Sequence, residues 1–309
     1  MNPWEEIEAV ATNDLGALVA RAHEVGTLAR VTPLIPVAAA ALLGIDAPRV
    51  AMAAMCGATT DVRVRAFHDR EGWVLTGDAG AIPWSDIAAT LLIVARTEPP
   101  SSPSTPLGLF VVDADRQGVV RAARTSIGSS TMSQVHLAGV RVGDGARRDD
   151  GVNVTWSSIN TALDGATIVA AAELAGLARG ALDAGVSYAT RREQFGAPIG
   201  SYQALAHRLA DMAIDTESAE LAVQEALDEP TPENASHAKI IANDAAHRVT
   251  AGLHQINGGV GFYADQIPPA YFARALALRV EMGDSRVHRL RLATQLAYPS
   301  ADHELGGLR

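Results

Sequence analysis

The spacing of hydrophobic and polar positions divides the chain into two helical regions separated by a region of strands. Up to about residue 56, apolar residues recur at helical spacing, as in "LGALVARAHEVGTLAR" and "LIPVAAAALLGI". From about residue 61 the period changes to two, as in "DVRVRAFHD" and "GWVLTGD". Four short apolar runs follow: "TLLIVAR", "LGLFVVD", "GVVRAAR" and "SQVHLAGVRV". After about residue 152 the helical period returns and holds to the end.

Four long segments after residue 152 predict four helices joined by short loops, which is the pattern of an antiparallel bundle. The first runs to Phe195 and is rich in Ala and Gly, which allow close approach of neighbouring helices. Ser201 is the expected N-cap of the second helix, and Thr231 begins the third with a Thr-Pro-Glu-Asn capping box. The fourth is predicted as one helix from Pro268 to Tyr298.

Strands that follow one another without intervening helices indicate an antiparallel sheet or barrel. We therefore predict an α+β fold with three parts. A short N-terminal helical domain covers residues 1–56, an antiparallel β domain covers 57–151, and a C-terminal four-helix bundle covers 152–309.

Composition narrows the classes of function. The net charge of −10 argues against general nucleic-acid binding. One cysteine, Cys56, excludes an intrachain disulfide and fits a reduced, cytoplasmic setting. The longest apolar stretch, residues 31–45, is interrupted by prolines and is too short to span a bilayer, and the first residues lack the basic region of a signal peptide.

Two segments of the bundle carry residue types suited to a nucleotide. In "RREQFGAPIGSYQALAHRLADM", Arg192 offers forked donors for a diphosphate, Phe195 an apolar ring and Gln203 an amide. The alternative is an arginine at a helix C-terminus, a core phenylalanine and a surface glutamine. In "LHQINGGVGF" a helix is expected to end at Asn257, before two glycines that allow close backbone approach or simply form a C-cap.

In this order and at this distance, the two segments resemble the acyl-CoA dehydrogenase family. "YATRREQFGAPIGSYQALAHRLADM" is similar to its Arg-x-x-Phe-Gly…Gln…Ala-Asp-Met segment, and "HQINGGVGF" to its Gln-x-x-Gly-Gly-x-Gly-Phe segment. The resemblance implies a helical domain, a β domain and a C-terminal bundle. It also implies FAD-dependent removal of two hydrogens from an acyl-CoA thioester, in which a carboxylate takes the α proton and the flavin takes the β hydride.

Family members share FAD across a subunit interface. The resemblance therefore implies that Arg192, Phe195 and Gln203 contact the diphosphate and adenosine side of a cofactor bound mainly by a neighbouring chain. It implies that Gln255, Gly258 and Gly259 contact the adenine and ribose side of that same cofactor.

The chain departs from the family where the catalytic base is expected. Met282 stands at the position of the usual glutamate; Glu281, one residue away, is rotated by about 100° on a helix and is a poor substitute. Ala166 occupies the alternative base position and Thr167 that of the arginine used near CoA. Asp164 remains, at a position that contacts CoA in the family. No catalytic residue is therefore assigned.

Other positions leave alternatives open. The flavin-facing Thr-Glu-Pro segment is missing from its expected place, and the N-terminal domain is shorter than in the family. Asp265 is a candidate replacement base or a solvated loop carboxylate. Glu173, inside the Ala-rich helix, is interpreted as a packing or inter-helix hydrogen-bond residue.

The pattern is similar to the short subunits of heteromeric acyl-CoA dehydrogenases that act on steroid side-chain CoA thioesters. We expect a heterotetramer with two full-length catalytic subunits, which bind most of the acyl-CoA and supply the base. We also expect half as many flavins as chains and an electron-transfer flavoprotein as acceptor. The alternatives are a homomeric enzyme whose base is Asp265 or Glu281, and a scaffold without cofactor.

Overall fold

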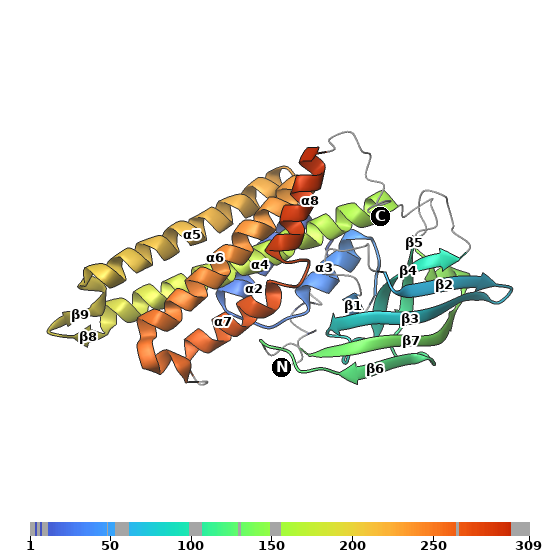
Figure 1. The fold of residues 1–309 in the computed structure, drawn as a ribbon, viewed down its shortest axis with the longest axis horizontal. Helices are drawn as coiled ribbons and strands as arrows, with labels where there is room; N and C mark the ends of the chain where they lie inside the picture. Colours follow the sequence, from blue (N-terminus) through green and yellow to red (C-terminus); the bar gives the residue numbers. More distant parts are fainter. Residues whose placement is uncertain are drawn as a thin grey trace.

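The computed structural model describes Trp4, Ile7 and residues 12–47, 49–52, 62–98, 107–128, 131–148, 156–263 and 266–297. An elongated group of helices adjoins a curled sheet at one of its ends (Figure 1). The order along the chain is helices, strands, helices, which confirms the predicted α+β order. The predicted domain boundaries and Cys56 lie outside the described residues.

Both helices predicted before the sheet are present. Helix α2 (Leu15–Thr27) begins after Asp14, whose carboxylate accepts hydrogen bonds from the backbone N–H groups of Gly16 and Ala17. Helix α3 (Leu34–Leu42) is Ala-rich and mostly buried. The short strand β1 (Val50–Met52) follows in a region where helical periodicity alone was predicted.

Glycines allow α2 to touch the backbone of α4 (Trp156–Arg191), the first helix of the bundle. A Cβ atom on Gly26 would lie 2.0 Å from the carbonyl oxygen of Glu173. A Cβ on Gly176 would lie 2.1 Å from that of His23, and one on Gly180 would lie 2.2 Å from that of Thr27. The prediction that small residues allow close helix approach is therefore confirmed, and the neighbouring helix is α2.

Seven strands of the described chain form one sheet, in the order β1-β4-β2-β3-β7-β6 with β5 on β4. Four pairs are antiparallel as predicted: β2–β3, β3–β7, β4–β5 and β6–β7. The six strands that follow β1 along the chain are β2 (Val64–Asp69), β3 (Gly72–Pro83), β4 (Thr90–Glu98), β5 (Leu107–Asp113), β6 (Val119–Ala123) and β7 (Met132–Val142).

The prediction of an antiparallel sheet is wrong for β4, which runs parallel to β1 and to β2. Strands β2 and β3 form a hairpin, and the chain then passes from β3 to the free edge of β2. A strand added at that edge runs in the direction of β2. Alternation of apolar residues shows which face of a strand is buried, but it does not show the direction of the neighbouring strand.

The bundle consists of α4, α5 (Gln203–Asp228), α6 (Pro232–Asn257), α7 (Ile267–Leu278) and α8 (Ser285–Ala297). The single fourth helix predicted from Pro268 to Tyr298 is therefore wrong, because the chain leaves the helical conformation between α7 and α8. Met282 and Gly283 there have φ values of +60° and +96°. The carboxylate of Asp284 then accepts from the N–H of Val287 at 2.8 Å at the start of α8. A glycine followed by an aspartate is typical of the end of one helix and the N-cap of the next, but the spacing of apolar residues continues across this break.

The two predicted helix caps have different outcomes. Thr231 accepts from the N–H of Asn234 at 3.1 Å, so this N-cap is confirmed. The prediction that Ser201 caps α5 is wrong: its hydroxyl donates to the carbonyl of Pro198, and α5 begins after Tyr202. A 3-10 turn, η3 (Ile199–Ser201), takes up Ser201 before the helix starts.

Helix α4 is the core helix of the bundle. From Ile159 to Arg191 it is long and apolar enough to cross a membrane, but 89% of its apolar window is buried inside the protein. Its partly polar side carries Arg179, which donates to Glu217 at 2.6 Å and to Glu220 at 2.5 and 3.0 Å.

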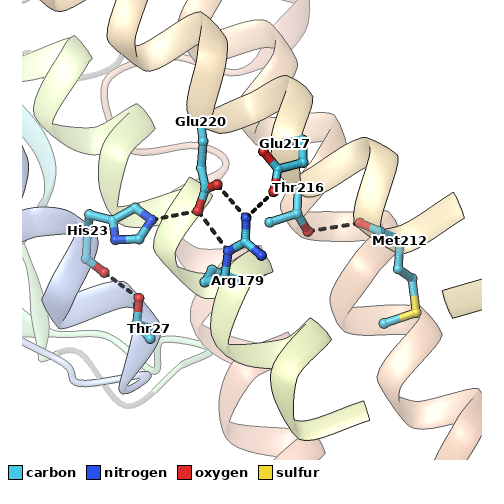
Figure 2. Close-up of polar contacts among 7 residues, drawn as sticks. All are labelled: His23, Thr27, Arg179, Met212, Thr216, Glu217 and Glu220. Carbon is cyan, nitrogen blue, oxygen red and sulfur yellow. Dashed lines mark hydrogen bonds and ion pairs between the residues drawn. The ribbon is translucent and has the colours of Figure 1, made fainter. Parts of the chain in front are cut away.

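His23 joins this network from α2, with its Nε2 atom 2.9 Å from a carboxylate oxygen of Glu220 (Figure 2). Burial alone would raise the pKa of Glu220, but the hydrogen bonds from Arg179 and His23 outweigh it and lower this pKa. One carboxylate therefore connects α2, α4 and α5.

Candidate functional site

The two segments singled out in the sequence lie at the same end of the bundle. A buried apolar cluster there joins the second half of α4 to α5 and α6 through Leu182, Met212 and Leu253. A Cβ on Gly185 of α4 would be 3.4 Å from Ile256 of α6 and 3.5 Å from Leu209 of α5. The hairpin after α4 and the glycine turn after α6 both extend from this end, the one farthest from the sheet (Figure 1).

The hairpin after α4 presents an aromatic ring to solvent. Strands β8 (Glu193–Gln194) and β9 (Ala197–Pro198) pair across a two-residue turn in which Phe195 and Gly196 have φ values of +56° and +85°. Positive φ at both central residues defines a type I′ turn, in which Asn-Gly is the usual pair. A non-glycine residue in this region costs about 1–3 kcal/mol. Phe195 is 94% exposed, so the alternative that it is a core residue is wrong.

The polar side chains beside this turn are also exposed. Arg192 uses its backbone to stabilise the hairpin, because its N–H donates to Tyr188 and its carbonyl accepts from Ile199. Among the described residues, no side chain or carbonyl is hydrogen-bonded to the guanidinium of Arg192 or to the amide of Gln203. Gln203 is the first residue of α5, where free backbone N–H groups favour an anion.

The second segment ends α6 at Asn257, as predicted. Gly258 has φ +60° and ψ −142°, a conformation that side chains disfavour. A Cβ on Gly258 or Gly259 would meet nothing within 4 Å, so the backbone here faces open space. Gln255 is exposed on the last turn of α6, and the short 3-10 helix η4 (Gly258–Phe262) continues the chain.

This donor set suits the diphosphate and adenosine half of FAD. Arg192 is a cation with forked donors, Gln203 and Gln255 supply amides, and the glycines leave room for a flat group against the backbone. The residues predicted as cofactor-binding therefore lie close to one end of the bundle, and all are exposed except Gly258, which is half-buried. The guanidinium of Arg192 and the amide of Gln203 make no hydrogen bond within the described chain, whereas the N–H of Gly258 donates to the carbonyls of His254 and Gln255. Their contact with a cofactor stays a prediction.

The positions where the family places its base are buried in this chain. Met282 is 4% exposed and Ala166 is fully buried. Thr167 is also buried, and its hydroxyl donates to the carbonyl of Leu163 within the helix. Glu281 is 8% exposed, and burial raises the pKa of its carboxyl although Arg274 and Lys239 act in the opposite direction. Asp265 lies outside the described residues.

Glu173 is part of a buried ion pair. Its carboxylate accepts from Nε and Nη2 of Arg274 at 2.9 and 2.6 Å. Burial raises the pKa of Glu173 to about 7, although Arg274 opposes this shift. The interpretation of Glu173 as an inter-helix hydrogen-bond residue is therefore confirmed.

Lys239 belongs to the same group of buried charges. Its Nζ donates to Asn243 at 2.8 Å and to the carbonyls of Leu278 and Gly283 at 3.1 and 3.2 Å. It therefore binds the end of α7 and the turn that contains Met282. His288 holds the same turn from α8, with Nε2 2.8 Å from the carbonyl of Met282, and burial lowers the pKa of its imidazole to about 4.

Asp164 forms an ion pair within the chain. It is 5% exposed and accepts a forked pair of hydrogen bonds from Arg291 of α8 at 2.5 and 3.0 Å. The CoA contact that the resemblance implies for this position competes with an internal ion pair here.

Sequence reasoning missed Lys239, Arg291 and Tyr202 as organising residues. Lys239 could have been noticed, because it is a lone cation among small apolar residues in "NASHAKIIANDAA". Arg291 has no such signal, because its partner Asp164 is 127 residues away.

Comparisons with known proteins agree with this geometry. Residues 155–297 match the family described as "Acyl-CoA dehydrogenase, C-terminal domain". The chain is 28% identical over 242 residues to the probable acyl-CoA dehydrogenase YngJ of Bacillus subtilis (strain 168), covering 76% of this chain and 63% of that protein. It is 34% identical over 146 residues to the acyl-CoA dehydrogenase IpdE2 of Mycolicibacterium smegmatis, 47% of each chain. The chain thus spans less than two thirds of these relatives.

Solved structures match over more of the chain. A chain of the ChsE4–ChsE5 complex from Mycobacterium tuberculosis superposes with a TM-score of 0.81 at 25% identity, over 95% of this chain and 87% of that one. The Tcur3481–Tcur3483 steroid ACAD G363A variant superposes with a TM-score of 0.80 at 27% identity, over 93% and 82%. The resemblance found in the sequence is therefore confirmed for the bundle: residues 155–297 match the acyl-CoA dehydrogenase C-terminal domain, and most of the chain shares the fold of these solved structures.

Proposed function

We propose that this chain is a subunit of an FAD-dependent acyl-CoA dehydrogenase that completes the FAD site of a catalytic partner and supplies no base itself. The observation that supports this most is a contrast between two sets of family positions. Those that would meet a neighbour's cofactor are mostly exposed, and the side chains of Arg192 and Gln203 make no hydrogen bond within the described chain, whereas the described positions that would hold a base are buried.

At the exposed set, each group has a distinct part. The guanidinium of Arg192 binds the diphosphate through charged hydrogen bonds. The ring of Phe195 covers an apolar edge of the nucleotide, and the amide of Gln203 orients it from the start of α5. Gln255 and the backbone of Gly258 and Gly259 bind the adenine and ribose. FAD held by these residues and the partner would supply the acceptor for a hydride from the acyl chain.

Among the described residues, the buried set provides no suitably placed base. Met282 is apolar, Ala166 has no functional group, and Glu281 lies in the core beside Arg274 and Lys239. Asp164 is bound by Arg291. The base and most of the acyl-CoA contacts therefore come from a full-length partner subunit.

The assembly and substrate are finer parts of the proposal. The similar ChsE4–ChsE5 structure is a complex, and the similar Tcur3481–Tcur3483 structure is that of a steroid ACAD. By similarity, we propose a heterotetramer with half as many flavins as chains, acting in the cytoplasm on a steroid side-chain CoA thioester. An electron-transfer flavoprotein is the proposed electron acceptor.

The test is to isolate the tagged chain from its own host and measure its partners and its FAD content. We expect a full-length acyl-CoA dehydrogenase to copurify, with one FAD for every two chains. A homogeneous yellow assembly of this chain alone, active on acyl-CoA, would support a homomeric enzyme with Asp265 or Glu281 as base. A stable colourless pair would support a scaffold.

Arg192→Ala tests the cofactor contact within that assembly. Charged hydrogen bonds contribute about 1.5–3 kcal/mol, so the dissociation constant of FAD should rise about 10- to 100-fold. Arg191→Ala is the matched control, because Arg191 is adjacent, is also exposed and donates to the carbonyl of Ser187. An unchanged dissociation constant for Arg192→Ala would remove this residue from the site.

A further inference from the structure

The turn that presents Phe195 is held by a residue that is not among the expected cofactor contacts. The hydroxyl of Tyr202 lies 2.9 Å from the carbonyl oxygen of Gln194 and 3.2 Å from that of Phe195. These carbonyls belong to the two peptide groups that follow Gln194 and Phe195. A donor placed between them restrains the peptide planes on both sides of Phe195, and therefore its φ and ψ angles.

Tyr202 is itself firmly placed. It is the N-cap residue of α5: its N–H donates to Ile199, and its carbonyl accepts from the N–H groups of Leu205 and Ala206. Its ring meets that of Phe195 edge to face, with centroids 6.3 Å apart and an interplanar angle of 83°. The exposed hairpin tip is thus tied to the rigid first turn of a helix.

Burial within the chain does not explain the conformation of Phe195. Its φ of +56° is strained for an aromatic residue, and its ring is 94% exposed. Asparagine or glycine would form the same type I′ turn with less strain. A strained conformation that persists without core packing is expected where a side chain is presented to a ligand.

We propose that Tyr202 is a positioning residue for the nucleotide, which acts by holding Phe195 in its outward conformation beside Gln203. This inference rests on the proposed function, because the ligand is FAD bound by the assembled complex. Gln203 follows Tyr202 directly. Tyr202 therefore fixes both the start of α5, which carries the amide of Gln203, and the turn that carries the ring of Phe195. The hydroxyl thereby reduces the ordering that FAD binding would otherwise require of the hairpin.

The first experiment removes only the hydroxyl. Tyr202→Phe should raise the dissociation constant of FAD about 5- to 10-fold, the effect of losing one hydrogen bond, when FAD is titrated into flavin-stripped complex. Hydrogen exchange of a peptide covering residues 191–202 should become faster, and the ³¹P resonances of the bound diphosphate should shift. The unfolding midpoint should stay unchanged, because the hairpin is exposed.

The matched control is Tyr271→Phe, which removes another tyrosine hydroxyl, bonded to the carbonyl of Thr27 at 2.6 Å. This variant should leave the FAD dissociation constant and the exchange of residues 191–202 unchanged. An FAD dissociation constant that Tyr202→Phe leaves unaltered would overturn the inference.

A double-mutant cycle tests whether Tyr202 acts through Phe195. Phe195→Asn removes the ring but keeps a residue that suits the turn. In this background, adding Tyr202→Phe should change the FAD dissociation constant less than 2-fold. Effects of the two substitutions that add in full would show that Tyr202 acts independently of Phe195, against the inference. If Arg192→Ala weakens FAD binding and Tyr202→Phe does not, this inference alone fails; if neither does, the proposed function fails too.

Discussion

Removing the guanidinium of Arg274 tests how the buried charges of the bundle stabilise the protein. Glu173 and Arg274 are 0% and 1% exposed, and the two hydrogen bonds that Arg274 donates to Glu173 go to one carboxylate oxygen. Arg274→Met keeps a long apolar side chain but leaves the carboxylate without its counter-charge. Breaking a buried pair in this way should lower the free energy of unfolding by about 3–5 kcal/mol at pH 8.

The loss should depend on pH, because Glu173 can take up a proton. Its pKa is raised from 4.5 to about 7 in the folded protein. Stability linked to the protonated form is fully present below pH 4.5 and is lost as the pH rises through 7; a shift of this size corresponds to about 3 kcal/mol. Without Arg274 this pKa rises further. The variant should therefore differ most from the wild type at pH 8 and less at pH 5.

The assay is urea unfolding followed by circular dichroism at pH 5, 6.5 and 8. The matched control, Glu173→Leu/Arg274→Met, removes both charges and leaves Lys239 and Glu281 in place. The free energy of unfolding of this double variant should be within about 1 kcal/mol of the wild-type value or higher, because apolar replacements of buried ion pairs are often neutral or stabilising. A loss below 1 kcal/mol for the single variant at pH 8, or a loss that is the same at every pH, would refute this reasoning.

Two further predictions concern the contacts of α2. Gly176→Ala places a Cβ 2.1 Å from the carbonyl oxygen of His23, so calorimetry should show a loss of unfolding free energy of about 1–3 kcal/mol or more. The control is Gly143→Ala, where the added Cβ lies in open space and should change this free energy by less than about 0.5 kcal/mol. Glu220→Gln should cost about 1–2 kcal/mol at pH 7. Because the pKa of Glu220 is lowered in the folded protein, this cost should disappear as the pH falls below 4.5. Glu217→Gln is the control, because Glu217 is more exposed. A loss of stability in Glu220→Gln that grows as the pH falls would contradict the role assigned to Glu220.

The periods of apolar residues were sufficient to predict most elements of this fold. A period of two identified β2 and β3, short apolar runs identified β4 to β7, and a period near 3.6 identified α2 to α6. They could not show that β4 runs parallel to β2, because that depends on which edge of a hairpin the chain reaches next. They also could not show the break at Met282, where the apolar spacing continues through a turn held by Lys239.

The sequence was likewise sufficient to predict some features of the candidate site and not others. Arg192, Phe195 and Gln203 could be singled out because donors and rings around a helix junction form a local pattern. The exposure of Phe195 could not be predicted, because an aromatic residue between two helices is usually buried. The pairing of Asp164 with Arg291 depends on two helices meeting in space, and neither residue shows it alone.

The backbone contact between α2 and α4 has a consequence for synthesis of the protein. Gly26 meets Glu173 only after about 150 further residues, including the whole sheet, have left the ribosome. At synthesis rates of about 5–20 residues per second, the apolar face of α2 remains without its partner for roughly 7–30 s. During this interval the nascent α2 segment exposes an apolar face that chaperones bind, and docking of α2 is expected to be a late event in folding.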